Sequence, residues 1–150
     1  MLSMALIIRP ARKSDIPSIV RLADEFNLAK ASSRERKDRL RMLFNDNSYN
    51  LFVAADPESK EVVGFVDFWL EPDFIEGDYN VFVDYLFVTK SWRKNRVGSK
   101  LLKEVVQFCK RNEVSTLYLS MKTGRKRLDK FYSKHGFKRD SILIEKNIRI

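Results

Sequence analysis

The sequence is poor in the residues that build metal centres and disulfide frameworks. Its 150 residues include one cysteine, Cys109, and one histidine, His135. A single cysteine excludes an internal disulfide, and so few cysteines and histidines argue against a metal site. Cys109 falls on an apolar helical pattern, where a thiol is more often a core residue than a nucleophile.

Long hydrophobic runs are also missing. No apolar stretch is long enough to cross a bilayer, and the apolar residues before Arg9 are too few for the hydrophobic region of a signal peptide. We therefore expect a cytoplasmic protein with no membrane partner. The chain has no internal repeat or low-complexity linker, and its length suffices for one ordinary core. The sequence predicts a single globular domain over residues 1–150.

Basic residues are absent from one whole segment. Between Lys60 and Lys90 there is no Lys or Arg, and the acidic residues there are Glu61, Asp67, Glu71, Asp73, Glu76, Asp78 and Asp84. Residues 1–88 carry 11 Lys/Arg and 15 Asp/Glu, net −4, whereas residues 89–150 carry 18 and 5, net +13. The basic half suits a polyanion and the acidic segment suits a cation, as in an enzyme that joins an anionic cofactor to an amine. Solvated charged faces are the alternative interpretation.

The almost unbroken apolar run from Val81 to Val88, interrupted by Asp84, predicts a strand that is covered on both faces. A short basic turn follows, and apolar residues then recur at positions 97, 101, 102, 105, 106, 108 and 109, which defines one face of a helix. Such a junction can hold an anion, because the N–H groups of the first helical turn and the positive end of the helix dipole face the turn.

The segment from Val88 to Leu102, V-T-K-S-W-R-K-N-R-V-G-S-K-L-L, resembles the acyl-coenzyme A motif of the GNAT superfamily of N-acetyltransferases. The family pattern is [Q/R]-x-x-G-x-[G/A], and Arg93 to Gly98 reads R-K-N-R-V-G. The outer positions match, but Arg96 replaces the first glycine. That glycine lets the backbone approach the cofactor pyrophosphate, so the arginine side chain could obstruct the approach or contact a phosphate.

This resemblance implies that the cofactor is acetyl-CoA (coenzyme A), held in two ways. The turn and helix start would bind its phosphates through Arg93, Lys94, Asn95, Arg96, Val97, Gly98 and Ser99. The backbone of Leu86, Phe87 and Val88 would hydrogen-bond the pantetheine arm, which in the family inserts between two splayed parallel strands. The second of these strands is predicted over residues 115–121.

Two residues are candidates for proton transfer. The segment 131–137, F-Y-S-K-H-G-F, resembles the F-Y-x-x-x-G-F signature of the same superfamily, which makes Tyr132 the candidate general acid. A packed aromatic residue on the last helix is the other interpretation. Asp84 is the candidate general base, because a carboxylate inside an apolar strand must be hydrogen-bonded, paired or raised in pKa. Glu71, Glu76 or a water chain could replace it.

The predicted fold class is α+β (α/β), and the resemblance implies its details. These are a mixed, mostly antiparallel sheet of six to seven strands, about four flanking helices and one parallel, splayed strand pair. Strands are expected at residues 6–9, 51–56, 62–70, 79–88, 115–121, 137–139 and 141–150. Helices are expected at about residues 14–27, from residue 33, at 97–112 and at 124–135, with Asn112 and Gly136 as left-handed caps.

We therefore expect an N-acetyltransferase that moves an acetyl group from acetyl-CoA to a primary amine by direct attack. The acceptor could be a polyamine or other small amine, a lysine or N-terminal amine of a protein, or an aminoglycoside-like or amino-acid amine. A catalytically silent acyl-CoA binder remains open because of Arg96. A nucleic-acid-binding module remains open because of Trp92 amid basic residues, although the acidic loop disfavours nucleic acid. The apolar terminal strand could pair two copies in a homodimer.

Overall fold

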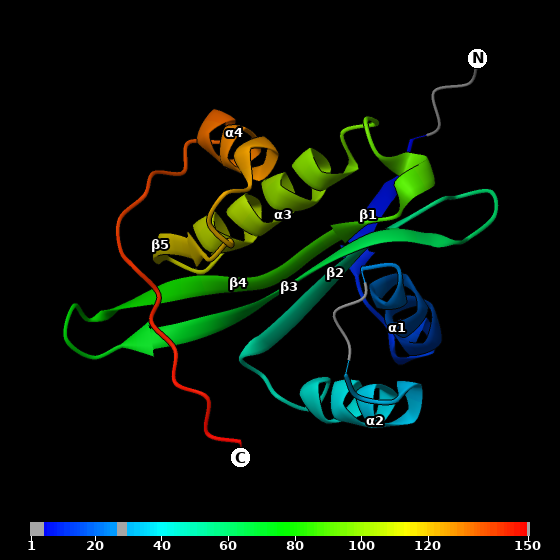
Figure 1. The fold of residues 1–150 in the computed structure, drawn as a ribbon, viewed down its shortest axis with the longest axis horizontal. Coiled ribbons are helices and arrows are strands. Elements are labelled where there is room, and N and C mark those ends of the chain that lie inside the picture. Colours follow the sequence, from blue (N-terminus) through cyan, green and yellow to red (C-terminus); the bar gives the residue numbers. More distant parts are fainter. Residues whose placement is uncertain (1–4, 27–29, 150) are drawn as a thin grey trace. The chain divides into compact units, whose positions relative to one another are not determined.

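The computed structural model describes residues 5–26 and 30–149 (Figure 1). The chain divides into two compact units, Met1–Tyr118 and Leu119–Ile150, and each is described by itself. The predicted end of the first helix near residue 27 lies outside the described residues. None of the helices in the described ranges has the length and apolar character needed to span a membrane.

Five strands form one sheet in the order β1-β2-β3-β4-β5. Their bounds are β1 Ile7–Pro10, β2 Tyr49–Ala55, β3 Val62–Asp73, β4 Asp78–Val88 and β5 Val114–Leu119. Neighbours from β1 to β4 are antiparallel. The strand β5 starts beside the start of β4, where the Ser115 hydroxyl donates to the Tyr79 carbonyl (3.3 Å), so this pair is parallel. The mixed, mostly antiparallel sheet is confirmed, with fewer strands than predicted.

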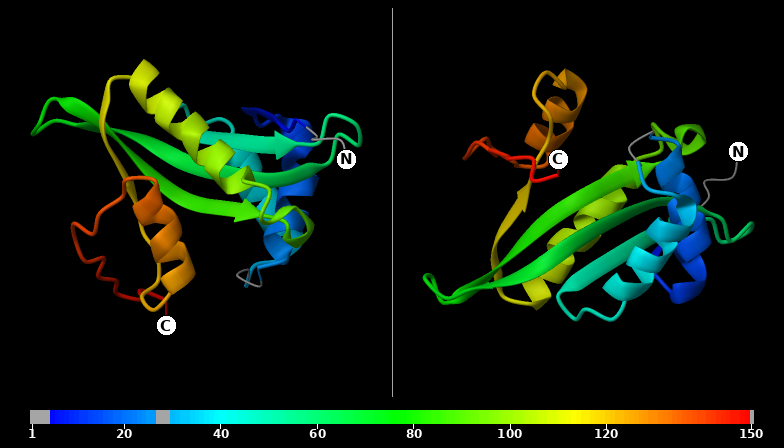
Figure 2. Two further views of the ribbon diagram at one scale, coloured as in Figure 1. Left: turned by 90° about the horizontal axis from the view of Figure 1, so that it is seen from above. Right: turned by 60° about the horizontal axis from the view of Figure 1, so that its bottom comes forward.

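Four α-helices accompany the sheet, together with two short 3₁₀ helices. Their bounds are η1 Lys13–Asp15, α1 Ile16–Asp24, α2 Ser33–Leu43, η2 Lys90–Trp92, α3 Val97–Arg111 and α4 Lys126–Lys134. In the first unit, α1 and α2 lie on one face of the sheet and α3 on the other (Figure 2). A capping box starts α2, in which the Glu35 N–H donates to the Ser32 hydroxyl (3.2 Å) and the Ser32 N–H donates to the Glu35 carboxylate (2.8 Å).

Each face of the sheet has its own core. The core on the α1 face is formed by buried apolar residues of the helices and the sheet, among them Ile16, Ile19, Val20, Leu22, Leu51, Val53 and Phe65. On the α3 face, the Phe108 ring packs against Phe52 and Phe68, with centroids 6.3 and 4.9 Å away. Burial on both faces explains why β2 and β3 read as near-continuous apolar runs.

The carboxyl-terminal segment differs from the prediction. Residues 137–149 form no strand, so the predicted hairpin of residues 137–139 with the following segment is wrong. Ile142, Leu143 and Ile144 are 88, 71 and 87% exposed. An apolar pattern favours a strand only where a partner edge completes its hydrogen bonds, and the pattern itself does not supply that edge.

The end of α3 differs by one residue. Asn112 has φ −113° and is not left-handed, whereas the next residue, Glu113, has φ 56°. The Asn112 side chain instead donates to the Phe108 carbonyl (2.8 Å), which closes the last turn of the helix. Gly136, after α4, has φ 86°, as predicted.

Candidate active site

The carboxyl-terminal half of β4 is the open part of the sheet. Val81 and Val83 are buried, whereas Asp84 and Tyr85 are exposed and residues 86–88 are half-buried. The prediction of a strand covered on both faces is therefore wrong for the second half. The edge of β4 is open over the same residues, because the six residues of β5 begin beside Asn80 and so end roughly level with Asp84 in a parallel pair.

Beyond Asp84, β4 offers backbone groups at one edge. The Thr89 N–H donates to the Val63 carbonyl (2.9 Å), and Phe87 pairs with Phe65, so the backbone of Phe87 faces β3. Because successive residues of a strand point their backbone groups to opposite edges, those of Leu86 and Val88 face away from β3. Of the three residues predicted to bind the pantetheine arm, these two present polar groups at the outer edge.

The turn after β4 has left-handed backbone at two basic residues, Lys94 with φ 68° and Arg96 with φ 59°. This conformation favours glycine, which accounts for the glycine of the family pattern at the position of Arg96. Arg96 is the N-cap of α3, and its side chain makes no capping hydrogen bond. The N–H groups of Val97 and Gly98 therefore face the turn without an intrahelical partner, at the positive end of the helix dipole.

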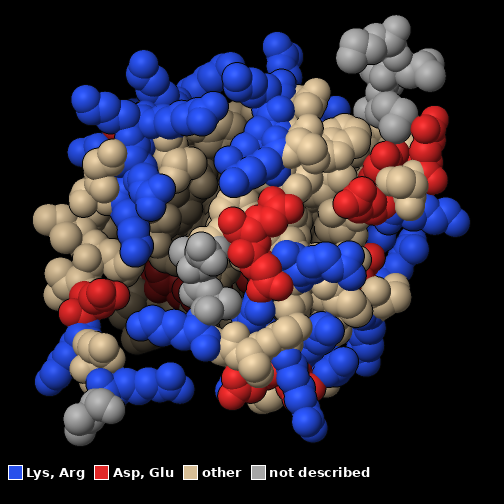
Figure 3. Space-filling model, turned by 45° about the vertical axis from the view of Figure 1, so that its right-hand side comes forward, with Lys and Arg blue, Asp and Glu red and all other residues tan. Residues whose placement is uncertain are grey.

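Four polar side chains of the turn lie at the surface: Arg93, Lys94, Asn95 and Arg96. The Asn95 amide donates to the backbone oxygens of Trp92 (3.3 Å) and Arg93 (3.2 Å), so it shapes the turn. Within the described residues, no hydrogen bond or ion pair engages the Arg96 guanidinium. Blue Lys and Arg groups cover more of the face shown in Figure 3 than red Asp and Glu groups do. Ser99 lies half-buried in the first turn of α3.

Arg93 points back toward the strand. Its Nε donates to the Val88 carbonyl at 3.4 Å, and its guanidinium carbon lies 5.4 Å from the centre of the Phe26 ring, a cation–π contact. Phe26 in turn stacks on Phe87, with centroids 4.0 Å apart. Arg93 thus hydrogen-bonds one of the carbonyl groups of β4 that face away from β3.

The end of α1 also holds the turn, through a residue to which the sequence analysis gave no role. One oxygen of the Glu25 carboxylate accepts from the Thr89 hydroxyl (2.7 Å), and the other accepts from the Lys90 N–H (3.4 Å). These contacts fix where β4 ends and the turn begins.

Asp84 sits on a β-bulge of β4. The register pairs Tyr85 with Asp67 and Val83 with Phe68, so Asp84 has no cross-strand partner. Its Oδ2 accepts from the Trp69 indole N–H at 2.9 Å. Partial burial raises the pKa of the Asp84 carboxyl, and the Trp69 hydrogen bond opposes that rise. The structure thus gives this carboxylate both a hydrogen bond and a raised pKa.

Asp67, behind the bulge, is a buried carboxylate that the sequence analysis did not assign. It is 8% exposed; its Oδ1 accepts from the Tyr85 N–H (2.9 Å) and its Oδ2 from the Tyr49 hydroxyl (2.6 Å). Burial raises the pKa of Asp67 to about 6 against these hydrogen bonds, and the charge of Asp84 adds to the rise. Its position in the apolar run of residues 62–70 is the signal that could have singled it out.

Gly64 of β3 is the second residue that the sequence analysis left without a role. A Cβ on Gly64 would lie 2.9 Å from the Phe87 carbonyl oxygen and 3.3 Å from side-chain atoms of both Val97 and Leu101. The first turn of α3 therefore packs directly on β3 and β4. Glycine is required for that close approach.

The acidic hairpin of residues 71–78 uses part of its charge to fold its own turn. Asp73 Oδ1 accepts from the N–H groups of Ile75 (2.9 Å) and Glu76 (3.2 Å). Glu71 and Glu76 themselves are exposed. Among residues 5–26 and 30–149, no three His, Cys, Asp or Glu side chains are arranged to hold a metal ion.

Tyr132 belongs to α4, in the second unit. Its ring packs edge-on against Phe131 and Phe137, with centroids 5.2 and 5.6 Å away. Burial raises the pKa of the Tyr132 phenol. The phenol therefore stays protonated at neutral pH, as a general acid must.

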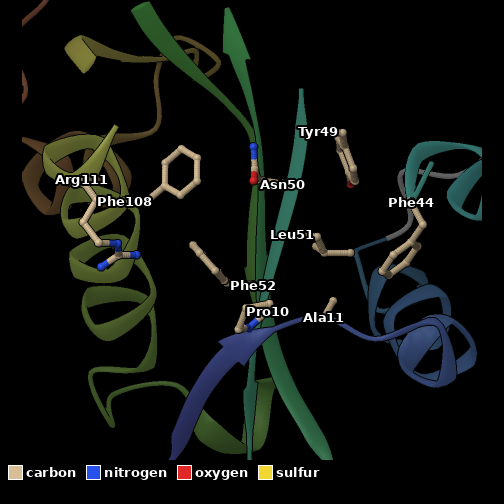
Figure 4. Close-up of a pocket in the computed structure, with 9 residues that line it drawn as sticks. All are labelled: Pro10, Ala11, Phe44, Tyr49, Asn50, Leu51, Phe52, Phe108 and Arg111. Carbon is tan, nitrogen blue, oxygen red and sulfur yellow. The ribbon is translucent and has the colours of Figure 1, made fainter. Parts of the chain in front are cut away.

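A cavity of about 350 Å³ lies elsewhere in the first unit (Figure 4). It is lined by Pro10, Ala11, Phe44, Tyr49, Asn50, Leu51, Phe52, Phe108 and Arg111. None of these residues belongs to the turn or to the open half of β4. Tyr49 is shared, because its ring lines the cavity while its hydroxyl donates to Asp67.

The junction of β4 and α3 fits a phosphorylated cofactor. It combines a helix start whose N-cap side chain makes no capping hydrogen bond, a turn with two left-handed residues, exposed basic side chains and an open strand edge. These features belong to an α+β protein and are typical of a strand–helix junction that can hold an anion. The chain belongs to the GNAT acetyltransferase family, since the model of the Acetyltransferase (GNAT) family matches residues 16–137. Members of this family use acetyl-CoA.

Solved structures with low sequence identity share the fold. Glucosamine-6-phosphate N-acetyltransferase from Arabidopsis thaliana has a TM-score of 0.80 and 17% identity, over 97% of this chain and 99% of that one. Aminoglycoside acetyltransferase meta-AAC0020, from an uncultured soil metagenomic sample and in complex with trehalose, has a TM-score of 0.82 and 18% identity, over 97% of this chain and 96% of that one. Aminoglycoside N-acetyltransferase AAC(6′)-Iy in complex with CoA has a TM-score of 0.83 and 16% identity, over 100% of both chains.

Proposed function

We propose that residues 1–150 act as one acetyltransferase domain that transfers the acetyl group of acetyl-CoA to a primary amine. The observation that carries this proposal is the open edge of β4 beside the start of α3, where the Arg96 side chain makes no capping hydrogen bond. Within residues 5–26 and 30–149, no hydrogen bond or ion pair engages the Arg96 guanidinium at the turn between them. The family match extends over both units, which supports one functional domain.

The residues of the junction would divide the binding of the cofactor between them. The N–H groups at the start of α3, at Val97, Gly98 and Ser99, would receive the phosphates, together with Lys94 and Arg96. The outward backbone groups of Leu86 and Val88 would hydrogen-bond the extended arm. Arg93 must then leave the Val88 carbonyl, and its guanidinium becomes available to a phosphate.

Bound acetyl-CoA supplies the thioester at which transfer takes place. The amine attacks in its neutral form: a C–N bond forms, the C–S bond breaks, and one proton moves from the amine nitrogen while another reaches the departing thiolate. Asp84 accepts the first proton, since its carboxylate is partly exposed at the bulge and its pKa is raised. Tyr132 donates the second, a role supported by the F-Y-x-x-x-G-F signature and by its raised pKa.

The acceptor is a small cationic amine, such as a polyamine or an aminoglycoside-like amine. The bulge carries Asp84 with Asp67 behind it, and the adjoining hairpin carries further exposed carboxylates. This charge attracts an ammonium group and repels a phosphorylated sugar. One fold relative is named for a phosphorylated amino sugar and another for an aminoglycoside, so the fold alone does not choose between these acceptors. The acidic charge near Asp84 favours the cationic acceptor.

Titration with CoA in a thermal unfolding experiment tests the cofactor. At about 100 times its Kd, a ligand stabilises the folded state by about 2.7 kcal/mol, which raises Tm by about 5–10 °C for a chain of this size. Thiol release from acetyl-CoA is then measured with spermidine, an aminoglycoside, a lysine peptide and glucosamine 6-phosphate. No stabilisation by CoA would contradict the proposed function, and stabilisation without thiol release would indicate a silent acyl-CoA binder.

We expect Arg96→Gly to raise the Kd for CoA by about 10- to 100-fold, because a charge-assisted hydrogen bond to a phosphate contributes about 1.5–3 kcal/mol. Lys60→Gly is the matched control, since Lys60 is also a basic residue with φ 59° but lies in the β2–β3 turn. Both substitutions relieve the same backbone strain, so only the phosphate contact distinguishes them. Tighter CoA binding by Arg96→Gly, measured by calorimetry, would show that the side chain obstructs the site.

Tyr132→Phe should lower kcat by about 10- to 100-fold and leave CoA binding unchanged. The loss is small for a general acid because a thiol pKa near 8.5 lets the thiolate leave readily at neutral pH. Tyr79→Phe removes a phenol from an exposed position and serves as the control. Full turnover by Tyr132→Phe would leave Tyr132 as a packing residue of α4.

A further inference from the structure

The bulge that presents Asp84 is held by a side chain as well as by the sheet ladder. At alternate positions of a regular antiparallel pair such as β3–β4, the two backbones hydrogen-bond each other. At the bulge, the Tyr85 N–H donates to the carboxylate of Asp67. The backbone that follows Asp84 is therefore fixed by a side chain of the neighbouring strand.

Asp67 joins three strands. It belongs to β3, one of its oxygens binds the backbone of β4 at Tyr85 (2.9 Å), and the other binds the hydroxyl of Tyr49 on β2 (2.6 Å). Both oxygens are thus engaged by donors from flanking strands. At 8% exposure, the carboxylate cannot exchange these donors for bulk water without opening the sheet.

The orientation of Asp84 depends on this arrangement. A bulge inserts one extra residue into a strand and so changes which face the neighbouring side chains point to. The direction of these side chains therefore depends on the position of the bulge. Asp84 reaches the Trp69 indole N–H, although Trp69 pairs with Phe82 in the register. A bulge that moved by one residue would turn the carboxylate of Asp84 toward the other face.

We propose that Asp67 is a positioning residue that fixes the bulge of β4 and thereby aims the carboxylate of Asp84 at the reacting amine. This inference rests on the proposed acetyl transfer and on Asp84 as its base. Asp67 itself does not touch substrate, since its oxygens are held by Tyr85 and Tyr49. Its contribution is to the geometry of proton transfer, so it acts on kcat more than on cofactor binding.

Two substitutions of Asp67 separate its hydrogen bonds from its charge. Asp67→Asn keeps an acceptor oxygen for the Tyr85 N–H, whereas Asp67→Val removes both acceptors. We expect kcat to stay within about threefold of the parent in Asp67→Asn and to fall by about 10²-fold in Asp67→Val, because misplacement by about 1 Å costs that much. The KM for acetyl-CoA should change less than about threefold in both variants, because the phosphates bind at the turn.

Asp56 provides the matched control. It is also 8% exposed, and its carboxylate accepts from the Glu58 N–H and the Ser59 hydroxyl, both at 3.0 Å, in the turn between β2 and β3. Asp56→Asn and Asp56→Val should lower Tm and leave the kcat of the folded enzyme unchanged. Parental kcat in folded Asp67→Val would overturn the inference, and so would equal losses in Asp67→Asn and Asp67→Val.

Tyr49→Phe tests the inference if Asp67→Val fails to fold. This variant removes only the donor on β2, so we expect faster hydrogen exchange of the Tyr85 amide, followed by NMR, and a several-fold lower kcat. Unchanged exchange and unchanged kcat would overturn the inference. A parent enzyme that neither binds CoA nor releases thiol would instead contradict the proposed function, whatever the exchange of the Tyr85 amide.

Discussion

Asp84→Asn is expected to lower kcat/KM for the amine by about 10³-fold, while CoA still stabilises the variant as it stabilises the parent. Asparagine has nearly the shape of aspartate and can accept from the Trp69 indole N–H, so the bulge should survive. It cannot accept the proton of the amine, and positioned general bases contribute about 10²- to 10⁴-fold. Steady-state thiol release over a range of amine concentrations measures the loss.

The pH profile gives this prediction a second readout. Asp84 accepts a proton only when it is ionised, and its pKa is raised above the ordinary carboxyl value. Activity should therefore fall, as pH is lowered, at a higher pH than an exposed carboxylate would give, and Asp84→Asn should lack this acid limb. Asp73→Asn removes the same charge from the hairpin, where Asp73 binds N–H groups of its own turn, and should keep the limb. Parental kinetics with a parental pH profile in Asp84→Asn would exclude Asp84 as the base.

Asp84 and Asp67 show how far the sequence predicts the site. A carboxylate in a long apolar run requires a partner or a shifted pKa whatever the fold, so Asp84 could be singled out before its hydrogen bond was seen. Asp67 lies in an equally apolar run, but its role depends on the position of the bulge, which sets Tyr85 opposite it. Strand register arises from contacts distant in sequence, so composition and spacing do not reveal it.

The predicted helices and strands also divide into those with a local cause and those that depend on distant parts of the chain. The helix start at Ser32 has a local cause, a capping box, and the left-handed Gly136 has another, the freedom of glycine at positive φ. Both were predictable from a few adjacent residues. The strand predicted over residues 141–150 is wrong for residues 141–149, because an apolar pattern leaves open whether an edge pairs with it. The open half of β4 also depends on a distant element, the length of β5.

Gly64→Val is expected to destabilise the fold and to abolish stabilisation by CoA. The Cβ would meet the Phe87 carbonyl oxygen at 2.9 Å, where backbone must move, and atoms of Val97 and Leu101 at 3.3 Å. Overpacking of this kind costs about 1–3 kcal/mol, and at about 2–4 °C per kcal/mol it should lower Tm by several degrees. Gly64→Ala should show the same effects to a smaller extent.

The cofactor effect of Gly64→Val follows from where the strain acts. The carbonyl that must move lies between Leu86 and Val88, whose outward groups are proposed to bind the arm of the cofactor, and Val97 begins the helix proposed to bind its phosphates. One added side chain thus displaces both parts of the site relative to each other. Ala55→Val, which enlarges another small buried residue, should lower Tm but keep the shift caused by CoA. A full CoA shift in folded Gly64→Val would mean that the cofactor does not bind at the junction of β4 and α3.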